Sequence, residues 1–240
     1  MRLLHEVFDR REAGDLDGAL ALVRRAYTEA LPGEVAELMF VHGRLLLERM
    51  DLATAEKVLG ALLQSTGDRA LLLRAQTALG EVYRAQGRYA EAEEVFIWTI
   101  TLAEAEWGPA SLELAKALNG LGIASRHAGD YAAAEAAYRR ALTVLESVAG
   151  PDHQDLAGLH RNLGGLAQAS GDLVAAAEHV RRAVKVRARA LGPDHPKVAA
   201  DRAALAQIMA ACPDDLDTAP RHDAVFIQSR PRALAWRLAP

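Results

Sequence analysis

The chain has 240 residues, 51% hydrophobic and 25% charged, a balance typical of a folded protein and not of a disordered or membrane-embedded one. Its formal net charge is −4, so it lacks the overall positive field that attracts nucleic acid or acidic lipid, and neither is expected as a partner. The one cysteine, Cys212, cannot form an internal disulfide. The first residues include Glu6, Asp9 and Glu12 and no apolar run of signal-peptide length, which favours a cytoplasmic location.

Repeated segments run along most of the chain. Two short ones come first, AGDLDGALALVRRA at 13–26 and RMDLATAEKVLGAL at 49–62. Three longer repeats follow with a period of 42 residues, marked by Gly87, Gly129 and Gly171. Each has two segments with apolar residues three and four apart, separated by a break such as HAGDY, where glycine ends a helix and aspartate caps the next. Each repeat is therefore predicted to be a pair of antiparallel helices, and a single helix is expected at about 194–211.

Small residues recur where the paired helices must cross. Gly122, Ala134 and Ala141 allow the two backbones to approach closely, and Tyr131 and Tyr138 are expected to fill the space beside them.

Histidines occupy the joints between repeats. His153 and His195 lie one period apart, in GPDHQD and GPDHPK, which indicates a structural role in the turn. His160 takes the position of Leu118 in the preceding repeat and is expected to be partly buried and hydrogen-bonded. His153 and His160 lack a third metal ligand, so a metal site is not favoured.

The third repeat resembles the tetratricopeptide repeat, whose motif is matched by Leu79, Gly80, Tyr83, Ala92 and Phe96. The 42-residue period and the GPDHP joint are most similar to the long repeats of the kinesin light chain type. This resemblance implies an all-α fold, a right-handed superhelical solenoid of antiparallel helix hairpins, with about five repeats plus a terminal helix.

Two regions are expected along the chain. The repeats account for residues 1–212, and a C-terminal tail follows at 213–240 with four prolines from Pro213 onward. Because the tail also carries Phe226, Ile227 and Trp236, we expect it to dock, either as a cap on the last repeat or as an occupant of the groove.

In the family that the chain resembles, the first helix of each hairpin lines a concave groove that holds a peptide. The resemblance assigns to this groove Arg44, Arg74, Thr77, Glu81, Arg84, Lys116, Asn119, Ile123, Arg126, His127, Arg161, Asn162 and Gln168. Basic groups outnumber acidic ones in this set, which favours an acidic peptide or a terminal carboxylate. Asn119 and Asn162 resemble the groove asparagines of the kinesin light chain type, and asparagine can bind peptide backbone.

Two further sets of residues are placed relative to the groove by the same resemblance. Five basic residues on the second helix of the fifth repeat are expected to face outward: Arg181, Arg182, Lys185, Arg187 and Arg189. Small residues should leave the carboxyl-terminal half of the groove roomy and apolar: Gly158, Gly165, Ala200, Ala203 and Ala210.

No catalytic motif is found: the sequence has no glycine-rich phosphate loop, no His-Glu-x-x-His and no serine elbow. We therefore expect a non-enzymatic adaptor without a cofactor, which binds a protein segment in its groove. The alternative is a ligand-responsive regulator that senses a small peptide or metabolite in the same groove. The apolar ends of the solenoid also favour homodimerisation, through an end helix or the tail.

Overall fold

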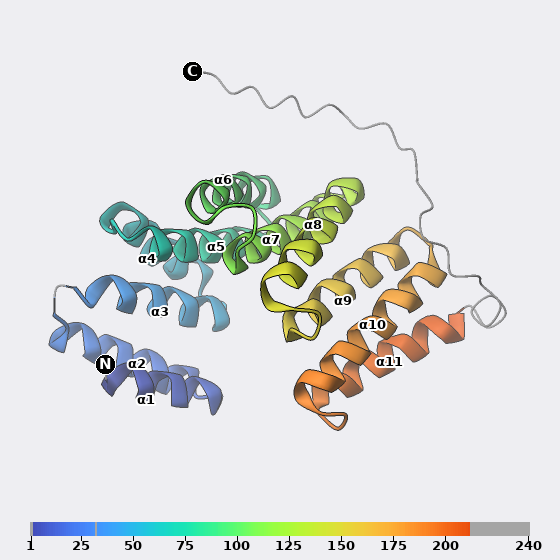
Figure 1. The fold of residues 1–240 in the computed structure, drawn as a ribbon. Coiled ribbons are helices and arrows are strands. Elements are labelled where there is room, and N and C mark those ends of the chain that lie inside the picture. Colours follow the sequence, from blue (N-terminus) through green and yellow to red (C-terminus); the bar gives the residue numbers. More distant parts are fainter. Residues whose placement is uncertain (1, 32, 212–240) are drawn as a thin grey trace, which may run out of the picture.

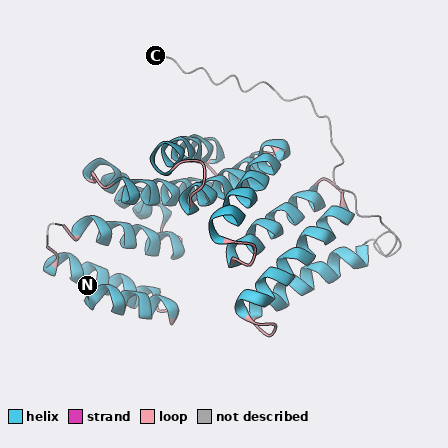
Figure 2. Cartoon of the chain, viewed as in Figure 1, coloured by secondary structure: helices cyan, strands magenta, loops and turns pink. Residues whose placement is uncertain are grey.

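The computed structural model describes residues 2–31 and 33–211, a part of the chain that contains eleven α-helices and no strand (Figure 1, Figure 2). The helices are α1 (Arg2–Glu12), α2 (Leu16–Glu29), α3 (Val35–Glu48), α4 (Leu52–Ser65), α5 (Arg69–Ala85), α6 (Tyr89–Trp107), α7 (Leu112–Ala128), α8 (Tyr131–Ala149), α9 (Gln154–Ala169), α10 (Leu173–Leu191) and α11 (Pro196–Ala211). Each odd-numbered helix up to α9 pairs with the helix that follows it, and α11 packs against α10. Five hairpins and a terminal helix are thus confirmed. Cys212 and the predicted tail at 213–240 lie outside the described residues.

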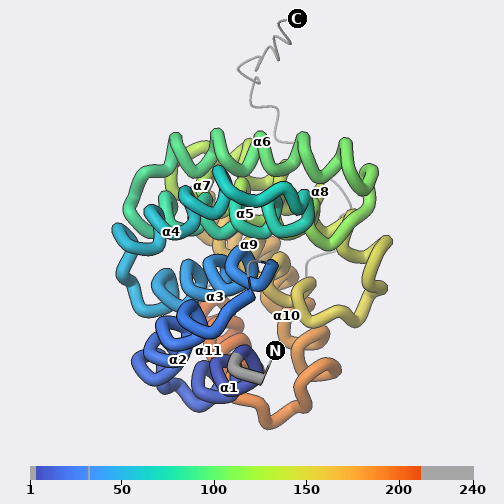
Figure 3. The backbone as a smooth tube through the Cα atoms, turned by 90° about the vertical axis from the view of Figure 1, so that its left-hand side faces the viewer, coloured from blue at the N-terminus to red at the C-terminus, as the bar shows by residue number. Residues whose placement is uncertain are grey.

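The hairpins stack into a right-handed superhelix. In Figure 3 the amino-terminal helices are nearest the viewer, and the path from α2 through α4, α6 and α8 to α10 runs clockwise as it recedes. The even-numbered helices form the outer rim of this turn, and α3, α5, α7 and α9 lie toward its axis. Since α3 contacts α5, α5 contacts α7 and α7 contacts α9, these four helices form a continuous inner layer.

The turn inside each hairpin follows the pattern seen in the sequence. Gly129 ends α7 with a φ of 87°, and the Asp130 carboxylate accepts a hydrogen bond from the Ala133 N–H at 2.9 Å. Met50 holds the matching place in the second hairpin with a φ of 64°, and it is the only non-glycine residue of the described chain with a positive φ. The repeat geometry therefore imposes a left-handed residue even where the sequence offers a methionine.

The histidines of the joints between repeats cap helices. His153 Nδ1 accepts a hydrogen bond from the Asp155 N–H at 3.3 Å, and His195 Nδ1 accepts one from the Lys197 N–H at 3.1 Å. Each ring satisfies a backbone donor that the first turn of a helix leaves without an intrahelical partner. The expected structural role of both residues is confirmed.

In the second to fifth hairpins, a glycine on the first helix lies against a large side chain of the second helix. A Cβ added at Gly122 would lie 2.6 Å from the Tyr138 ring, so only glycine allows this approach. The same arrangement joins Gly43 to Leu59, Gly80 to Phe96 and Gly164 to Val180. Tyr138 is fully buried as expected, but the expectation for Tyr131 is wrong: it lies at the first position of α8 and is 44% exposed.

Buried apolar side chains form two main clusters along the solenoid. One spans α1 to α5, and the other spans mainly α6 to α10. Phe96 on α6 lies between them, because its ring contacts both Gly80 of α5 and Gly120 of α7. A smaller cluster, which includes Val180 and Ile208, joins α10 to α11.

Candidate functional site

All thirteen residues assigned to the groove lie on odd-numbered helices, from α3 to α9. These helices form the inner layer of the superhelix (Figure 3). The side chains differ, however, in what they contact, and three stretches of the inner layer can be distinguished.

Ion pairs between α3 and α5 occupy the first stretch. Arg44 donates to Glu81 at 2.6 Å, and Arg74 donates to both carboxylate oxygens of Glu37, at 2.9 and 3.2 Å. Arg74 also lies 4.1 Å from the centre of the Phe40 ring. The expected excess of positive charge is absent from this stretch, because each arginine is paired with a carboxylate of the neighbouring helix.

The second stretch, at the carboxyl ends of α5 and α7, keeps cations without such partners. Within the described residues neither Arg84 nor Arg126 forms an ion pair. His127 stacks on Tyr89, with ring centres 5.2 Å apart, and burial together with the charges of Arg126 and Arg84 lowers the pKa of His127. This end of the inner layer is positively charged.

Two of the assigned residues have local roles in this stretch. The Thr77 hydroxyl donates to the Leu73 carbonyl of its own helix at 3.0 Å, and Ile123 packs against the core. Thr77 and Ile123 therefore offer less free surface to a ligand.

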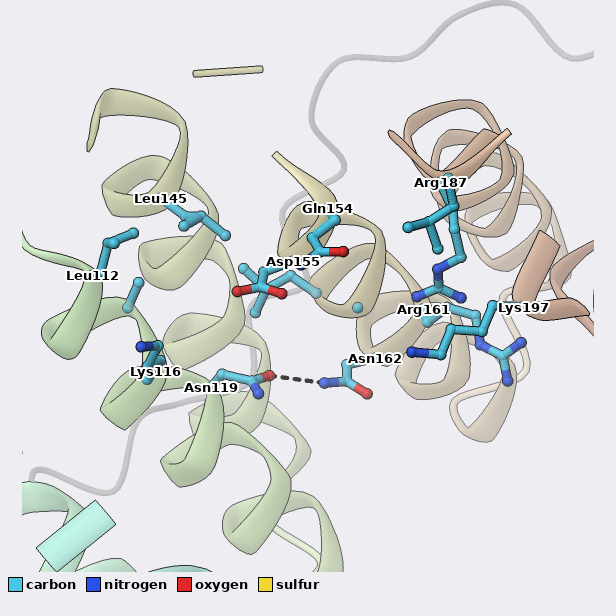
Figure 4. A pocket seen from close by; sticks show the side chains of 14 residues that line it. Leu112, Lys116, Asn119, Leu145, Gln154, Asp155, Arg161, Asn162, Arg187 and Lys197 are labelled. Carbon is cyan, nitrogen blue, oxygen red and sulfur yellow. Dashed lines mark hydrogen bonds between the residues drawn. The ribbon is translucent and has the colours of Figure 1, made fainter. Parts of the chain in front are cut away.

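The third stretch is a pocket of about 390 Å³ between α7, α9, α10 and the beginning of α11 (Figure 4). Lys116, Asn119, Arg161 and Asn162 line it, so the structure brings these four assigned residues together. The Asn162 side-chain amide donates to the Asn119 carbonyl oxygen at 2.8 Å and links α9 to α7. Gln168 lies near the other end of α9 and does not line the pocket.

The two glycines expected to leave room in the groove differ in their surroundings. A Cβ at Gly158 would meet no heavy atom within 4 Å, and Gly158 lines the cavity. At Gly165 the expected room is filled, because a Cβ there would lie 3.1 Å from Arg126 Nη1.

Arg187 is the main residue that sequence reasoning placed wrongly. It was expected to face outward with the other basic residues of α10, but it lines the pocket and its side chain is only 16% exposed. Its guanidinium bonds Asp201 of α11 at 2.5 Å, and Arg161 bonds the other oxygen of the same carboxylate at 2.7 Å. The Asp201 side chain is fully buried.

A repeat comparison could have revealed this cluster. Arg187 stands 42 residues after Leu145, and Asp201 stands 42 residues after Leu159, both of which are buried. Lys197, Gln154 and Asp155 complete the polar lining of the pocket and were also missed. The expectation that this half of the groove is apolar is therefore wrong.

The buried histidine is hydrogen-bonded as expected. His160 Nδ1 lies 3.4 Å from Nδ1 of His179 on α10, and burial is the main cause that lowers the pKa of His160 to about 4. In the part of the chain that the structure describes, no group of three or more His, Cys, Asp or Glu side chains is arranged to hold a metal ion. Across the same residues, no helix is both long enough and apolar enough to cross a membrane.

Comparison with known proteins agrees with this architecture. Two family models of the tetratricopeptide repeat match the chain, one over residues 72–109 and the other over residues 113–187. No curated protein matches it.

Several solved structures share the fold at low sequence identity. BtubC (BKLC) from P. vanneervenii is 21% identical with a TM-score of 0.60, and the match covers 92% of this chain and 98% of that one. A thermophilic TPR protein from Thermus thermophilus is 21% identical with a TM-score of 0.65, over 87% of this chain and 98% of that one. A protein of Podosopora anserina with nearly identical TPR-like repeats, described as a kinesin light chain, is 18% identical with a TM-score of 0.60, over 72% and 84%.

The repeats found in the sequence, the stacked hairpins and the two family matches lead to one conclusion. The chain belongs to the tetratricopeptide repeat family.

Proposed function

We propose that this protein is a non-enzymatic adaptor that binds an extended segment of a partner protein along the inner faces of α5, α7 and α9. Tetratricopeptide repeats in general serve as scaffolds for protein–protein interaction. One observation supports the inner face in particular: Lys116, Asn119, Arg161 and Asn162 come from two repeats and line one pocket. Their amides and cations suit peptide backbone and acidic side chains.

The charges favour a segment that is acidic where it crosses α7. Lys116 and Arg126 lie on α7 and have no ion-pair partner among the described residues, so a peptide carboxylate can approach either one without displacing a native contact. Arg44 and Arg74 are less available to an acidic segment, because it would have to compete with Glu81 and Glu37 for them.

Affinity capture with matched charge variants tests this proposal. Lys116→Glu with Arg126→Glu reverses two inner-face charges. Arg181→Glu with Lys185→Glu makes the same change on exposed residues of α10 and serves as the control. Arg161→Glu is avoided, because it would bring a second carboxylate against the buried Asp201.

We expect the intact protein and the outer-face variant to retain the same partner and the inner-face variant to lose it. A peptide from that partner should then bind the intact protein at least tenfold more tightly than the inner-face variant. Equal capture by both variants would refute the inner-face site.

A second candidate, a regulator that responds to a small ligand, is favoured by the size of the pocket. A volume of about 390 Å³ lies within the range of small-molecule sites. Such a ligand should raise the melting temperature of the protein by itself, in the absence of any partner protein. A metabolite mixture that leaves the melting temperature unchanged would count against this candidate.

A further inference from the structure

Two charged residues, Arg187 in the lining of the pocket and Asp201 behind it, occupy positions where the two preceding repeats are apolar. Arg187 corresponds to Leu145 and to Ala103, and both of these are buried in the core. Asp201 corresponds in the same way to Leu159 and Ala117, which are buried as well. At the joint between α9, α10 and α11 the chain has thus replaced packed apolar side chains with a guanidinium and a carboxylate.

Stability alone gives no reason for this replacement. A buried ion pair is often no more stabilising than well-packed apolar residues of similar volume, because both charges lose their hydration. The preceding repeats show that the same positions accept leucine and alanine in this fold. The charged pair therefore indicates a requirement of the pocket and not of the solenoid.

The arrangement leaves positive charge facing the cavity. Asp201 holds two guanidiniums with one carboxylate, so Arg161 and Arg187 are fixed beside each other with only one negative charge between them. Each guanidinium has five N–H donors, and one nitrogen of each is bonded to Asp201. Several donors therefore remain available on two planar groups of fixed orientation.

Two lysines add to this charge. Lys197 lies four residues before Asp201, on the same face of α11, and Lys116 lines the pocket from α7 (Figure 4). Neither lysine forms an ion pair with a described residue. Among the described residues, Asp155 is the one acidic side chain that lines the pocket. Asp201 lies behind the lining and contributes the second negative charge. The four cationic side chains at the pocket are therefore matched by only two carboxylates.

We propose that this pocket binds a doubly charged oxyanion, either a phosphate monoester or two neighbouring carboxylates, between Arg161, Arg187 and the two lysines. The planar guanidiniums bind two oxygens of the anion with paired N–H donors, and the lysines neutralise the second charge. Asp201 does not touch the ligand; it positions the two arginines. The inference rests on the proposed function in that the oxyanion belongs to the bound segment, although a free phosphate compound has the same chemistry.

A charge-neutral double variant is the sharpest test. Arg187→Leu with Asp201→Leu restores the leucines of the preceding repeat and removes one positive and one negative charge, so the net charge of the pocket does not change. We expect this variant to unfold at the same denaturant concentration as the intact protein or a higher one. Arg182→Leu, on the exposed face of α10, is the matched control.

Binding is measured by calorimetric titration with inorganic phosphate, phosphoserine and succinate. We expect saturable binding of phosphate or phosphoserine to the intact protein and to the control, with Kd about 1 mM or lower. The double variant should bind at least tenfold more weakly. Unchanged binding by the double variant, or no saturable binding of any of the three probes to the intact protein, would overturn the proposal.

A second variant keeps the test decisive if the double variant does not fold. Lys116→Ala with Lys197→Ala leaves the buried cluster intact and should also weaken phosphate binding at least tenfold, whereas unchanged binding would overturn the proposal. Tighter binding of phosphoserine than of succinate would identify the ligand group as a phosphate monoester. Tighter binding of succinate would identify it as two neighbouring carboxylates. These titrations need no partner protein, so failure of the pocket and failure of the adaptor function give different results.

Discussion

At the scale of single residues, Met50 carries a conformational cost that the other turns avoid. It adopts a φ of 64° where four hairpins have glycine, and its side chain is 65% exposed, so packing gives little compensation. A left-handed conformation costs a non-glycine residue about 1–2 kcal/mol. We expect Met50→Gly to raise the free energy of unfolding by about 0.5–1 kcal/mol in chemical denaturation, after the entropy cost of glycine is deducted.

The reverse substitution at the matching turn is the control for Met50. Gly87 has a φ of 77° and no neighbour within 4 Å of an added Cβ, so Gly87→Met introduces strain without a clash. It should lower the free energy of unfolding by about 1 kcal/mol. If both substitutions leave stability unchanged, backbone strain at this turn is not a significant energetic term.

The buried histidine pair predicts a stability that depends on pH. Because burial lowers the pKa of His160 from 6.5 to about 4, the unfolded chain binds this proton more readily than the folded one. The neutral pair is fully compatible with folding above pH 6.5, and stability is lost as pH falls from 6.5 toward 4. We expect the free energy of unfolding to fall by about 2 kcal/mol between pH 7 and pH 5 from this residue.

The repeat itself supplies the control for this prediction. His160→Leu with His179→Ala restores the residues of the preceding repeat, Leu118 and Ala137, and should remove most of this pH dependence. The remaining charged groups around the pair are kept: Arg182 and Glu178 on α10, and Arg139 and Glu135 on α8. A double variant with the same loss of stability between pH 7 and pH 5 would assign the effect to other groups.

Single-residue contacts were only partly predictable from the sequence. Arg44 and Glu81 are 37 residues apart, as are Glu37 and Arg74, and 37 is also the distance between the matching glycines Gly43 and Gly80. Residues at matching positions of the second and third repeats, 37 apart, face each other on α3 and α5. Opposite charges at this spacing therefore predict ion pairs between the two helices. The expectation of free groove charges at these positions therefore overstated the positive field beside α3.

At the scale of helices, the crossing inside each hairpin depends on one alanine. The matching positions are all fully buried alanines: Ala19, Ala55, Ala92, Ala134 and Ala176. Ala134→Leu must displace packed neighbours and should lower the free energy of unfolding by about 1–3 kcal/mol. Ala136→Leu, exposed on the same helix, should change it by less than about 0.5 kcal/mol. Thermal denaturation distinguishes these cases, and a small effect at Ala134 would contradict the packing described.

The periodicity of the sequence predicted the helices and their order, but it did not predict that Arg187 on α10 faces the pocket. Apolar spacing and the capped turns predicted five hairpins and the last helix, because each local signal agrees with the others. Arg187 was assigned outward because it lies on the second helix of its hairpin, which faces outward in the geometry of the family that the chain resembles. The side chain turns inward because Asp201, fourteen residues later and on another helix, provides a buried partner. Such a contact depends on tertiary packing, which the pattern within one helix does not contain.

At the scale of the whole molecule, Phe96 joins the two apolar clusters. Its ring contacts α5 on one side and α7 on the other, and each repeat otherwise contacts mainly its neighbours. We expect Phe96→Ala to cost about 3–5 kcal/mol and to separate urea unfolding into two transitions. Tyr138→Ala removes a buried aromatic ring within one cluster, so unfolding should remain a single transition at lower urea. A single transition in the Phe96 variant would show that another contact couples the halves.

α11 is the last described helix of the solenoid, and this position affects how long the pocket stays complete. Within the described residues no helix follows α11, so we expect it to open locally before the layers behind it and its amide hydrogens to exchange with solvent faster than those of α7 or α9. Whenever α11 opens, Asp201 and Lys197 leave, and the two arginines lose their common anchor. We therefore expect hydrogen exchange in α11 to report how long the pocket stays complete.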